Sequence, residues 1–200
     1  MNAGIAHLVD DDEAIRDALG WLLRSRGVTS QVWSSAEAFL HDYGPEMDGC
    51  LVLDVRMSGM SGIELFDHLL VLGCTMPTLF LTGHGDIPLA VQALKKGAFD
   101  FIEKPCNDNE LVDRIIAALQ LNHEQRKHAA STASIETRLR SLTTREREVM
   151  ERILVGQYNK VIAAELSIAM RTVEVHRARI FEKMAVKSAV ELAQLLAQQN

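Results

Sequence analysis

Short apolar runs alternate with amphipathic stretches over the first 121 residues of the chain. The runs have the length of buried strands, which we expect at residues 5–9, 28–33, 50–54, 78–82 and 100–103. Apolar positions with helical spacing separate and follow them, which predicts helices at residues 13–25, 36–43, 61–72, 87–96 and 107–121. Five strand–helix units predict an α/β fold, a doubly wound five-stranded parallel sheet with right-handed crossovers.

The strand pattern disappears after residue 121. Residues 122–137 are polar, and they form either a linker or a continuation of the preceding helix, because Ala, Gln, Glu and Arg are good helix formers. From residue 138 every segment has helical periodicity, with helices expected at residues 144–155, 159–166, 170–184 and from 189 on. The sequence therefore predicts three parts: an α/β domain at 1–121, a linker at 122–137, and a small all-α domain at 138–200.

Polar residues mark the beginnings of several expected helices. Ser34 with Glu37 and Thr143 with Glu146 both have the spacing of a capping box. Asn159 is placed to cap the helix that follows it.

Charge is distributed unevenly along the chain, which has a net charge of -6. Residues 1–121 hold 8 Lys and Arg against 18 Asp and Glu, whereas residues 138–200 hold 11 against 7. An acidic first domain is suited to a divalent cation, and a basic second domain to a polyanion such as a nucleic acid.

The composition also bears on where in the cell the protein is found. No apolar run approaches the roughly 18 residues that span a bilayer. The first apolar run is not a signal peptide, because the acidic residues 10–12 end it after only a few positions. The three cysteines are unclustered and fit neither a zinc site nor a disulfide framework. We expect a cytoplasmic protein with no membrane partner.

Polar side chains follow four of the expected strands. Asp10 and Asp11 follow the first, Asp54 ends the third, Thr82 ends the fourth, and Lys104 follows the fifth. Because the carboxyl ends of parallel strands meet at one edge of the sheet, we expect these groups to share a pocket. A carboxylate can accept a phosphoryl group as a reactive acyl phosphate, and Mg²⁺ prefers oxygen ligands.

The residue types assign a role to each group in this pocket. Asp11 and Asp54 would bind Mg²⁺ directly, and Asp10 would bind it through a water. Lys104 would supply a positive charge to a phosphoryl oxygen, and Thr82 a hydroxyl donor. The sequence therefore predicts a phosphoacceptor site.

The segments 9–11, 53–57, 81–83 and 103–105 together resemble the receiver domain of response regulators, over residues 5–121. The resemblance implies a flavodoxin-like fold and phosphorylation of Asp54. It also implies that the backbone carbonyl of Arg56 completes the metal site, that the Lys104–Pro105 bond is cis, and that Thr82 and Phe101 form a switch pair.

The chain departs from the receiver pattern at two positions. Ser58 stands where related sequences usually carry proline, and Cys106 where they carry an aromatic residue. Neither change touches the acidic or basic groups of the pocket. His84 is interpreted as an exposed loop residue.

Residues 138–200 resemble the LuxR-type helix-turn-helix, on the segments 142–148, 159–160 and 171–177. Combined with the receiver, they are most similar to the FixJ-type subfamily. The resemblance implies four helices, with a two-helix DNA reader at 162–166 and 172–184. One departure is Ala169, which stands where a serine helix cap is usual.

Helical periodicity sorts the last reader helix into two faces. Val173, Ile180 and Met184 should pack inward. The face expected to meet base edges carries Arg171, Glu174, Val175, Ala178 and Arg179. Residues better placed for DNA phosphates are Lys160, Thr172, Lys183 and Lys187.

These features predict a phosphorylation-activated, DNA-binding transcriptional regulator of a two-component system, not an enzyme. Its expected partners are a histidine kinase that phosphorylates Asp54, double-stranded DNA, a second copy of the phosphorylated chain, and RNA polymerase. One alternative is a DNA-binding regulator whose first domain is a phosphorylation-independent interaction module. Another is a phosphohydrolase with Asp54 as nucleophile, although Arg56 stands where a second acid would be needed.

Overall fold

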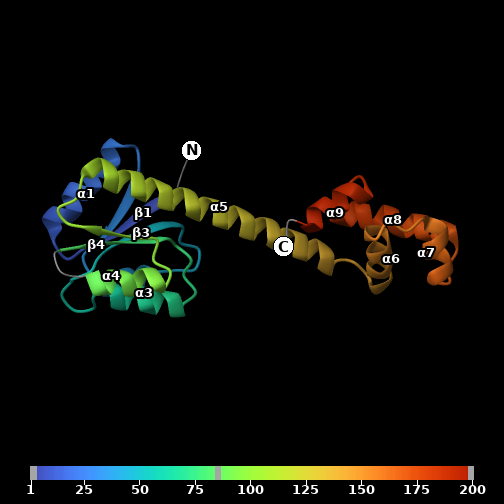
Figure 1. The fold of residues 1–200 in the computed structure, drawn as a ribbon, viewed down its shortest axis with the longest axis horizontal. Helices are drawn as coiled ribbons and strands as arrows, with labels where there is room; N and C mark the ends of the chain where they lie inside the picture. Colours follow the sequence, from blue (N-terminus) through green and yellow to red (C-terminus); the bar gives the residue numbers. More distant parts are fainter. Residues whose placement is uncertain (1–3, 84–86, 198–200) are drawn as a thin grey trace. The chain divides into compact units, whose positions relative to one another are not determined.

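The chain divides into two compact units, and the boundary between them falls after Arg126 in the sequence (Figure 1). The computed structural model describes residues 4–83 and 87–197, and each unit is considered by itself. His84, interpreted above as an exposed loop residue, lies outside the described residues.

A parallel sheet of five strands forms the centre of the first unit. The strands are β1 (Ile5–Val9), β2 (Thr29–Trp33), β3 (Gly49–Asp54), β4 (Thr78–Thr82) and β5 (Asp100–Glu103). Their order across the sheet is β2-β1-β3-β4-β5, and every neighbouring pair is parallel. The predicted doubly wound sheet is confirmed, and its strand order reverses at β1 and β3, the place where ligands bind in such sheets.

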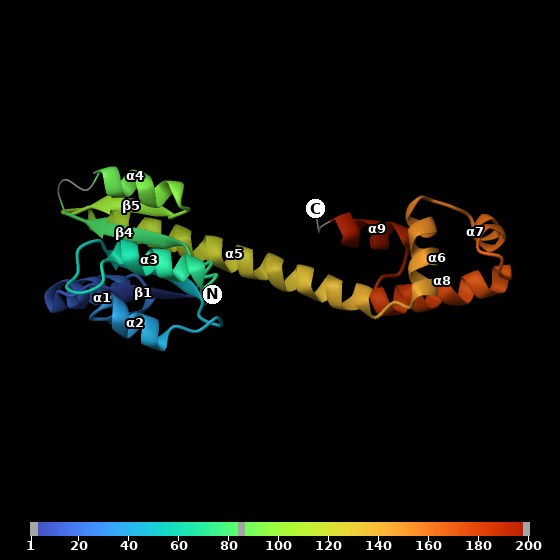
Figure 2. The same cartoon turned by 90° about the horizontal axis from the view of Figure 1, so that it is seen from below.

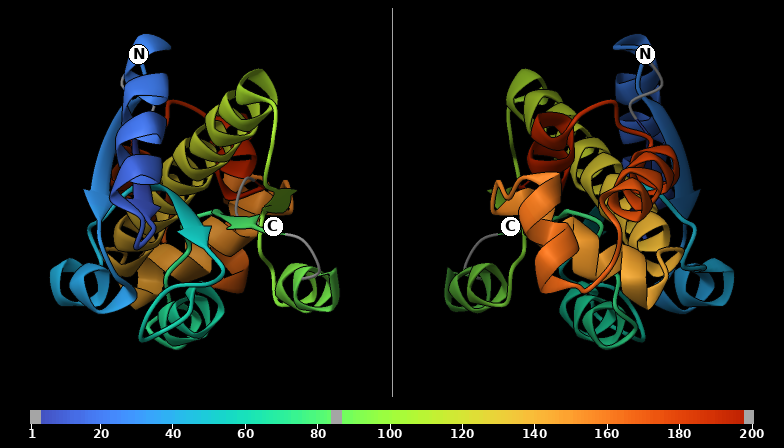
Figure 3. Two further views of the ribbon diagram at one scale, coloured as in Figure 1. Left: turned by 90° about the vertical axis from the view of Figure 1, so that its left-hand side faces the viewer. Right: turned by 90° about the vertical axis from the view of Figure 1, so that its right-hand side faces the viewer.

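Helices cover both faces of this sheet (Figures 2 and 3). One face packs against α1 (Glu13–Ser25) and α5 (Asp108–Arg140), and the other against α2 (Ala36–Asp42), α3 (Gly62–Val71) and α4 (Ile87–Lys95). Side chains alternate between the two cores: Leu8 and Val52 lie in the α1–α5 core, whereas Val9 and Leu53 lie in the other. Burial on both faces explains why the strand at 50–54 is continuously apolar.

Helix α5 continues well beyond the end expected at residue 121. It runs to Arg140, so the stretch 122–137, left open between linker and helix, is helical. In the first unit, the Asn122 side chain accepts a hydrogen bond from the Gly49 N–H at 2.9 Å. In the second unit, Ile135 is buried and Arg138 donates to the carbonyl of Met184 at 2.9 Å. Each end of the helix therefore contributes to a different core.

The second unit is built from helices around one apolar core. After the end of α5, they are α6 (Thr144–Leu154), α7 (Asn159–Glu165), α8 (Met170–Met184) and α9 (Ala189–Ala197). The side chains at the centre of the core are fully buried, namely Val149, Ile162, Val173, Ile180, Met184 and Leu192. Among the described residues, no helix has both the length and the apolar composition needed to span a bilayer.

Helix caps agree with the sequence in part. The capping box of Thr143 and Glu146 is present at α6. The predicted box of Ser34 and Glu37 is wrong by one residue, because Ser35 caps α2 and Glu37 accepts a hydrogen bond from Met60 instead.

Two further caps lie in the second unit. The prediction for α7 is also wrong: Tyr158 occupies the cap position, without a side-chain hydrogen bond, and Asn159 is already helical. At α8, Ala169 occupies the cap position and makes no side-chain hydrogen bond, as expected for alanine.

The start of α3 packs directly on the end of β3. A Cβ atom at Gly62 would lie 2.1 Å from the carbonyl oxygen of Asp54, so the backbone there has to move for any larger residue. We expect Gly62→Ala to lower the free energy of unfolding by about 1–3 kcal/mol, the usual cost of overpacking a core. Urea denaturation measures the loss, and Gly44→Ala is the control, because no heavy atom lies within 4 Å of that Cβ position. Equal loss in both variants would contradict this assignment.

Candidate functional site

Two aspartates and one lysine meet at the carboxyl edge of the sheet. Val9 and Leu53 are register partners in β1 and β3, so Asp10 and Asp54, which follow them, lie side by side. Lys104 follows β5, and its Nζ donates to Asp54 Oδ1 at 2.7 Å and to Asp10 Oδ2 at 3.0 Å. Lys104 therefore joins the first, third and fifth strands of the sheet at one point.

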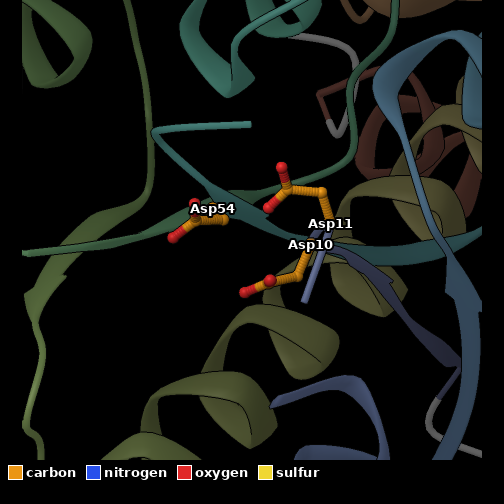
Figure 4. Close-up of side chains that lie close together, drawn as sticks. All are labelled: Asp10, Asp11 and Asp54. Atoms are coloured by element: carbon orange, nitrogen blue, oxygen red, sulfur yellow. The ribbon is translucent and has the colours of Figure 1, made fainter. Parts of the chain in front are cut away.

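Asp11 lies next to this pair (Figure 4). One carboxylate oxygen from each of Asp10, Asp11 and Asp54 lies within 4.8 Å of the others. The groups come from the ends of two neighbouring strands, and all the donors are oxygens. Such a set suits a hard divalent cation, and Mg²⁺ in particular commonly binds to few carboxylates and keeps several waters.

Hydrogen bonds from the β3–α3 connection fix two of these carboxylates. The Arg56 N–H donates to Asp54 Oδ2 at 3.1 Å. The N–H and the hydroxyl of Ser58 both donate to Asp11 Oδ2, each at 2.7 Å. The expectation that Ser58 touches none of the acidic groups is therefore wrong, because Ser58 takes part in the site through Asp11.

Burial and charge shift the acid–base properties of the pocket in opposite directions. Burial raises the pKa of Asp54, and hydrogen bonding to Lys104 only partly offsets this. Burial alone would lower the pKa of Lys104, but its bonds to Asp54 and Asp10 outweigh burial and raise it. The hydroxyl and N–H of Ser58 lower the pKa of Asp11. Lys104 is thus held as a cation facing the carboxylates.

The expected switch residues occupy adjacent strands. Thr82 is buried at the end of β4, and its hydroxyl donates to the Gly83 carbonyl at 3.1 Å. Phe101 on β5 pairs in register with Phe80, and the two ring centroids are 5.8 Å apart. The Lys104–Pro105 bond is cis, as the resemblance implied.

Helix α8 of the second unit has the two faces that periodicity predicts. Val173, Ile180 and Met184 are fully buried. On the other side, Glu174 is half-buried and four side chains are exposed, those of Arg171, Val175, Ala178 and Arg179. Arg171 and Glu174 form an exposed ion pair at 3.2 Å. This outer surface carries two arginines on one helix, as groove-reading helices do.

The residues expected at DNA phosphates divide into two groups. Lys160, Thr172 and Lys187 are exposed. Lys183 instead donates to Glu146 Oε2 at 2.6 Å and to the Ser141 carbonyl at 3.0 Å. The structure thus places its ammonium group between α8 and the start of α6.

Glu146 is a second residue that sequence reasoning described incompletely. Its side chain is 3% exposed, and its Oε2 also accepts the Thr143 N–H at 2.8 Å. Burial would raise the pKa of Glu146, but the bonds from Lys183 and Thr143 outweigh it and lower the pKa. The capping box signal located Glu146, but nothing in the sequence pairs it with a lysine 37 positions away.

Family models match both units of the chain. Residues 6–116 match the response regulator receiver domain, and residues 140–196 match the bacterial regulatory proteins of the luxR family. A receiver domain followed by a luxR-family domain defines a DNA-binding response regulator of a two-component system.

Known transcriptional regulators are similar to this chain over nearly its whole length. The C4-dicarboxylate transport transcriptional regulatory protein DctR of Rhodobacter capsulatus is 47% identical, covering 94% of this chain and 97% of its own length. The transcriptional regulatory protein FixJ of Bradyrhizobium diazoefficiens is 43% identical, covering 96% and 94%. The chain belongs to this family of two-component transcriptional regulators.

Solved structures of similar proteins cover both units. The response regulator StyR superposes with a TM-score of 0.91 at 43% identity, covering 98% of this chain and 99% of that one. Full-length FixJ from B. japonicum gives a TM-score of 0.62 at 42% identity, covering 98% and 97%.

The Glu146–Lys183 pair gives a test of how α8 is held. We expect Glu146→Gln to lower the local stability of α8 by about 1–2 kcal/mol, because the bond from Lys183 then reaches a neutral amide oxygen and the ion pair is lost. Amide hydrogen exchange of α8 measures this, with the exposed Glu182→Gln as control.

The pH dependence has a definite sign. Because the folded pKa of Glu146 is lowered, its contribution to stability is full above the ordinary value of 4.5 and is lost as the pH falls below it. Glu146→Gln should therefore flatten this part of the pH profile. An unchanged profile, or unchanged protection of α8, would show that the pair contributes nothing.

Proposed function

We propose that this response regulator accepts a phosphoryl group on Asp54 from a histidine kinase and then binds double-stranded DNA through α8 to control transcription. The observation that carries the proposal is the contact of Lys104 with both Asp54 and Asp10, at 2.7 and 3.0 Å. It places a fixed cation beside the Asp54 carboxylate, and the two further carboxylates could hold the Mg²⁺ that would neutralise a phosphoryl dianion.

The residues divide the work of phosphoryl transfer. An oxygen of Asp54 attacks the phosphorus of a phosphohistidine, so an O–P bond forms while the N–P bond breaks. The Lys104 ammonium group would then donate to an oxygen of the phosphoryl group, and the Thr82 hydroxyl would donate to another. Mg²⁺, held by Asp10, Asp11, Asp54 and the Arg56 carbonyl, would neutralise charge on the phosphoryl oxygens.

Phosphorylation would bias a two-state equilibrium in the first unit. Thr82 would turn from the Gly83 carbonyl toward the phosphoryl group, and Phe101 on the adjacent strand would move with it. The changed surface would bind a second copy of the chain. Two copies would place two reader helices on half-sites about one helical turn apart and would present the dimer to RNA polymerase.

The second unit supplies the DNA contacts in this proposal. Base edges would be read by the outer surface of α8, formed by Arg171, Glu174, Val175, Ala178 and Arg179. Phosphates would be bound by Lys160, Thr172 and Lys187, which are exposed. Lys183 is left to its bond with Glu146.

Two alternatives predict different outcomes in simple assays. A phosphohydrolase would hydrolyse a chromogenic phosphate ester, but Arg56, and no acid, stands two residues beyond Asp54. A phosphorylation-independent module would bind DNA equally before and after acyl phosphate treatment. The acid–lysine pocket favours the phosphoacceptor over the interaction module, and Arg56 argues against the phosphohydrolase, so the proposed protein is a regulator without turnover on an external substrate.

The phosphoacceptor is tested by substitution. We expect Asp54→Asn to abolish phosphate incorporation, because an amide nitrogen or oxygen cannot replace the carboxylate nucleophile. Intact mass after incubation with Mg²⁺ and acetyl phosphate measures incorporation, and exposed Asp113→Asn on α5 is the control. Full labelling of Asp54→Asn would overturn the assignment.

The DNA surface is tested by the salt dependence of binding. We expect the affinity for a labelled random-sequence duplex to fall steeply with salt, because bound phosphates release counterions. Lys160→Ala and Lys187→Ala should each reduce the slope of log affinity against log salt by about 1. Lys95→Ala on α4 is the control, and its slope should match the unmodified protein. A flat salt response would contradict phosphate contacts by the second unit.

A further inference from the structure

Alternate residues of the β3–α3 connection bind three carboxylates. This connection, residues 55–61, is named the phosphoacceptor loop below. Its backbone N–H groups donate from Arg56 to Asp54 Oδ2 (3.1 Å), from Ser58 to Asp11 Oδ2 (2.7 Å) and from Met60 to Glu37 Oε1 (2.9 Å). The three acceptors belong to β3, to the β1–α1 connection and to α2, so the loop ties three elements together.

Ser58 is distinguished from the other two donors by its side chain. Its hydroxyl donates to the same Asp11 oxygen as its N–H, again at 2.7 Å. Two donors from one residue therefore fix one oxygen of Asp11. A proline at position 58 would supply neither donor, since it has no N–H and no hydroxyl.

Asp11 is the carboxylate at the site that most needs such support. Asp10 is buried, and Lys104 bonds both Asp10 and Asp54. Asp11 is exposed, and an exposed side chain loses rotamer freedom when it binds a cation. A carboxylate that is already oriented loses less rotamer entropy when the cation binds.

We propose that Ser58 is a positioning residue for the divalent cation, which holds Asp11 turned toward the carboxylates of Asp10 and Asp54. The inference rests on the cation site of the proposed function. Ser58 is suited to this role because both its donors are neutral and therefore orient the carboxylate without cancelling its charge, as a lysine would.

The far end of the phosphoacceptor loop keeps Ser58 in place. Gly59 has a φ of +80°, and a Cβ atom there would lie 2.8 Å from Glu37 Oε1. Glycine thus allows Glu37 to approach and bind the Met60 N–H. Because the loop is anchored at Glu37 on one side and at Asp54 on the other, the position of Ser58 is set by the fold.

The test compares Mg²⁺ affinity in the full chain. Amide chemical shifts of residues 10–12 and 54–58 are followed in ¹⁵N-labelled protein as MgCl₂ is added. Removing an outer hydrogen-bond partner of a metal ligand typically costs 10–100-fold in affinity, and Ser58→Ala keeps the backbone donor, so we expect a loss of roughly tenfold. Ser58→Thr, which keeps both donors, should restore most of the affinity, and Ser34→Ala in the β2–α2 connection should match the unmodified protein.

A kinetic readout separates positioning from general damage. In phosphorylation by acetyl phosphate, Ser58→Ala should need roughly tenfold more Mg²⁺ for half-maximal rate and reach nearly the same rate at saturation. Its melting temperature without Mg²⁺ should equal that of the unmodified protein.

The outcomes distinguish this inference from the proposed function. Saturable Mg²⁺ shifts with equal affinity in Ser58→Ala and the unmodified protein would overturn the role of Ser58 and leave the cation site intact. No saturable shifts in the unmodified protein would overturn the cation site and, with it, both proposals. A lowered plateau rate with unchanged Mg²⁺ dependence would also overturn a positioning role.

Discussion

Asp10 and Asp54 approach so closely at the edge of the sheet that one ammonium group, that of Lys104, bonds both. Register between β1 and β3 forces this proximity, since Val9 pairs with Leu53. Two carboxylates at such a distance repel each other, and the positive charge of Lys104 makes the arrangement stable. In the proposed function the same charge would meet an incoming phosphoryl group, so one interaction would both stabilise this edge of the sheet and serve its chemistry.

The fold and the central groups of the pocket could be predicted because they depend on local patterns. Strand lengths, helix periodicity and the polar residues that end strands all follow from neighbouring residues in the chain. Asp54 and Lys104 are recognisable for that reason, although they lie 50 positions apart. The parallel arrangement brings every strand end to one edge without any further information.

Apart from helix boundaries and caps, the features that sequence reasoning missed depend on the approach of segments distant in the chain. Glu37 was assigned to its own helix start, yet it binds Met60, 23 positions away. Lys183 was expected at a DNA phosphate, and its bond with Glu146, 37 positions away, was not foreseen. In both cases a charged side chain has a partner that only the tertiary structure brings near it.

The hydrogen bonds around the three aspartates also bear on which cation the pocket selects. Both oxygens of Asp10 and of Asp54 accept hydrogen bonds, and so does one oxygen of Asp11. Hydrogen bonds on carboxylate oxygens disfavour bidentate metal binding, whereas Ca²⁺ is commonly bound by both oxygens of a carboxylate in a shell of six to eight ligands. This hydrogen-bond pattern suits a small octahedral ion that retains its water better than an ion that needs bidentate carboxylates.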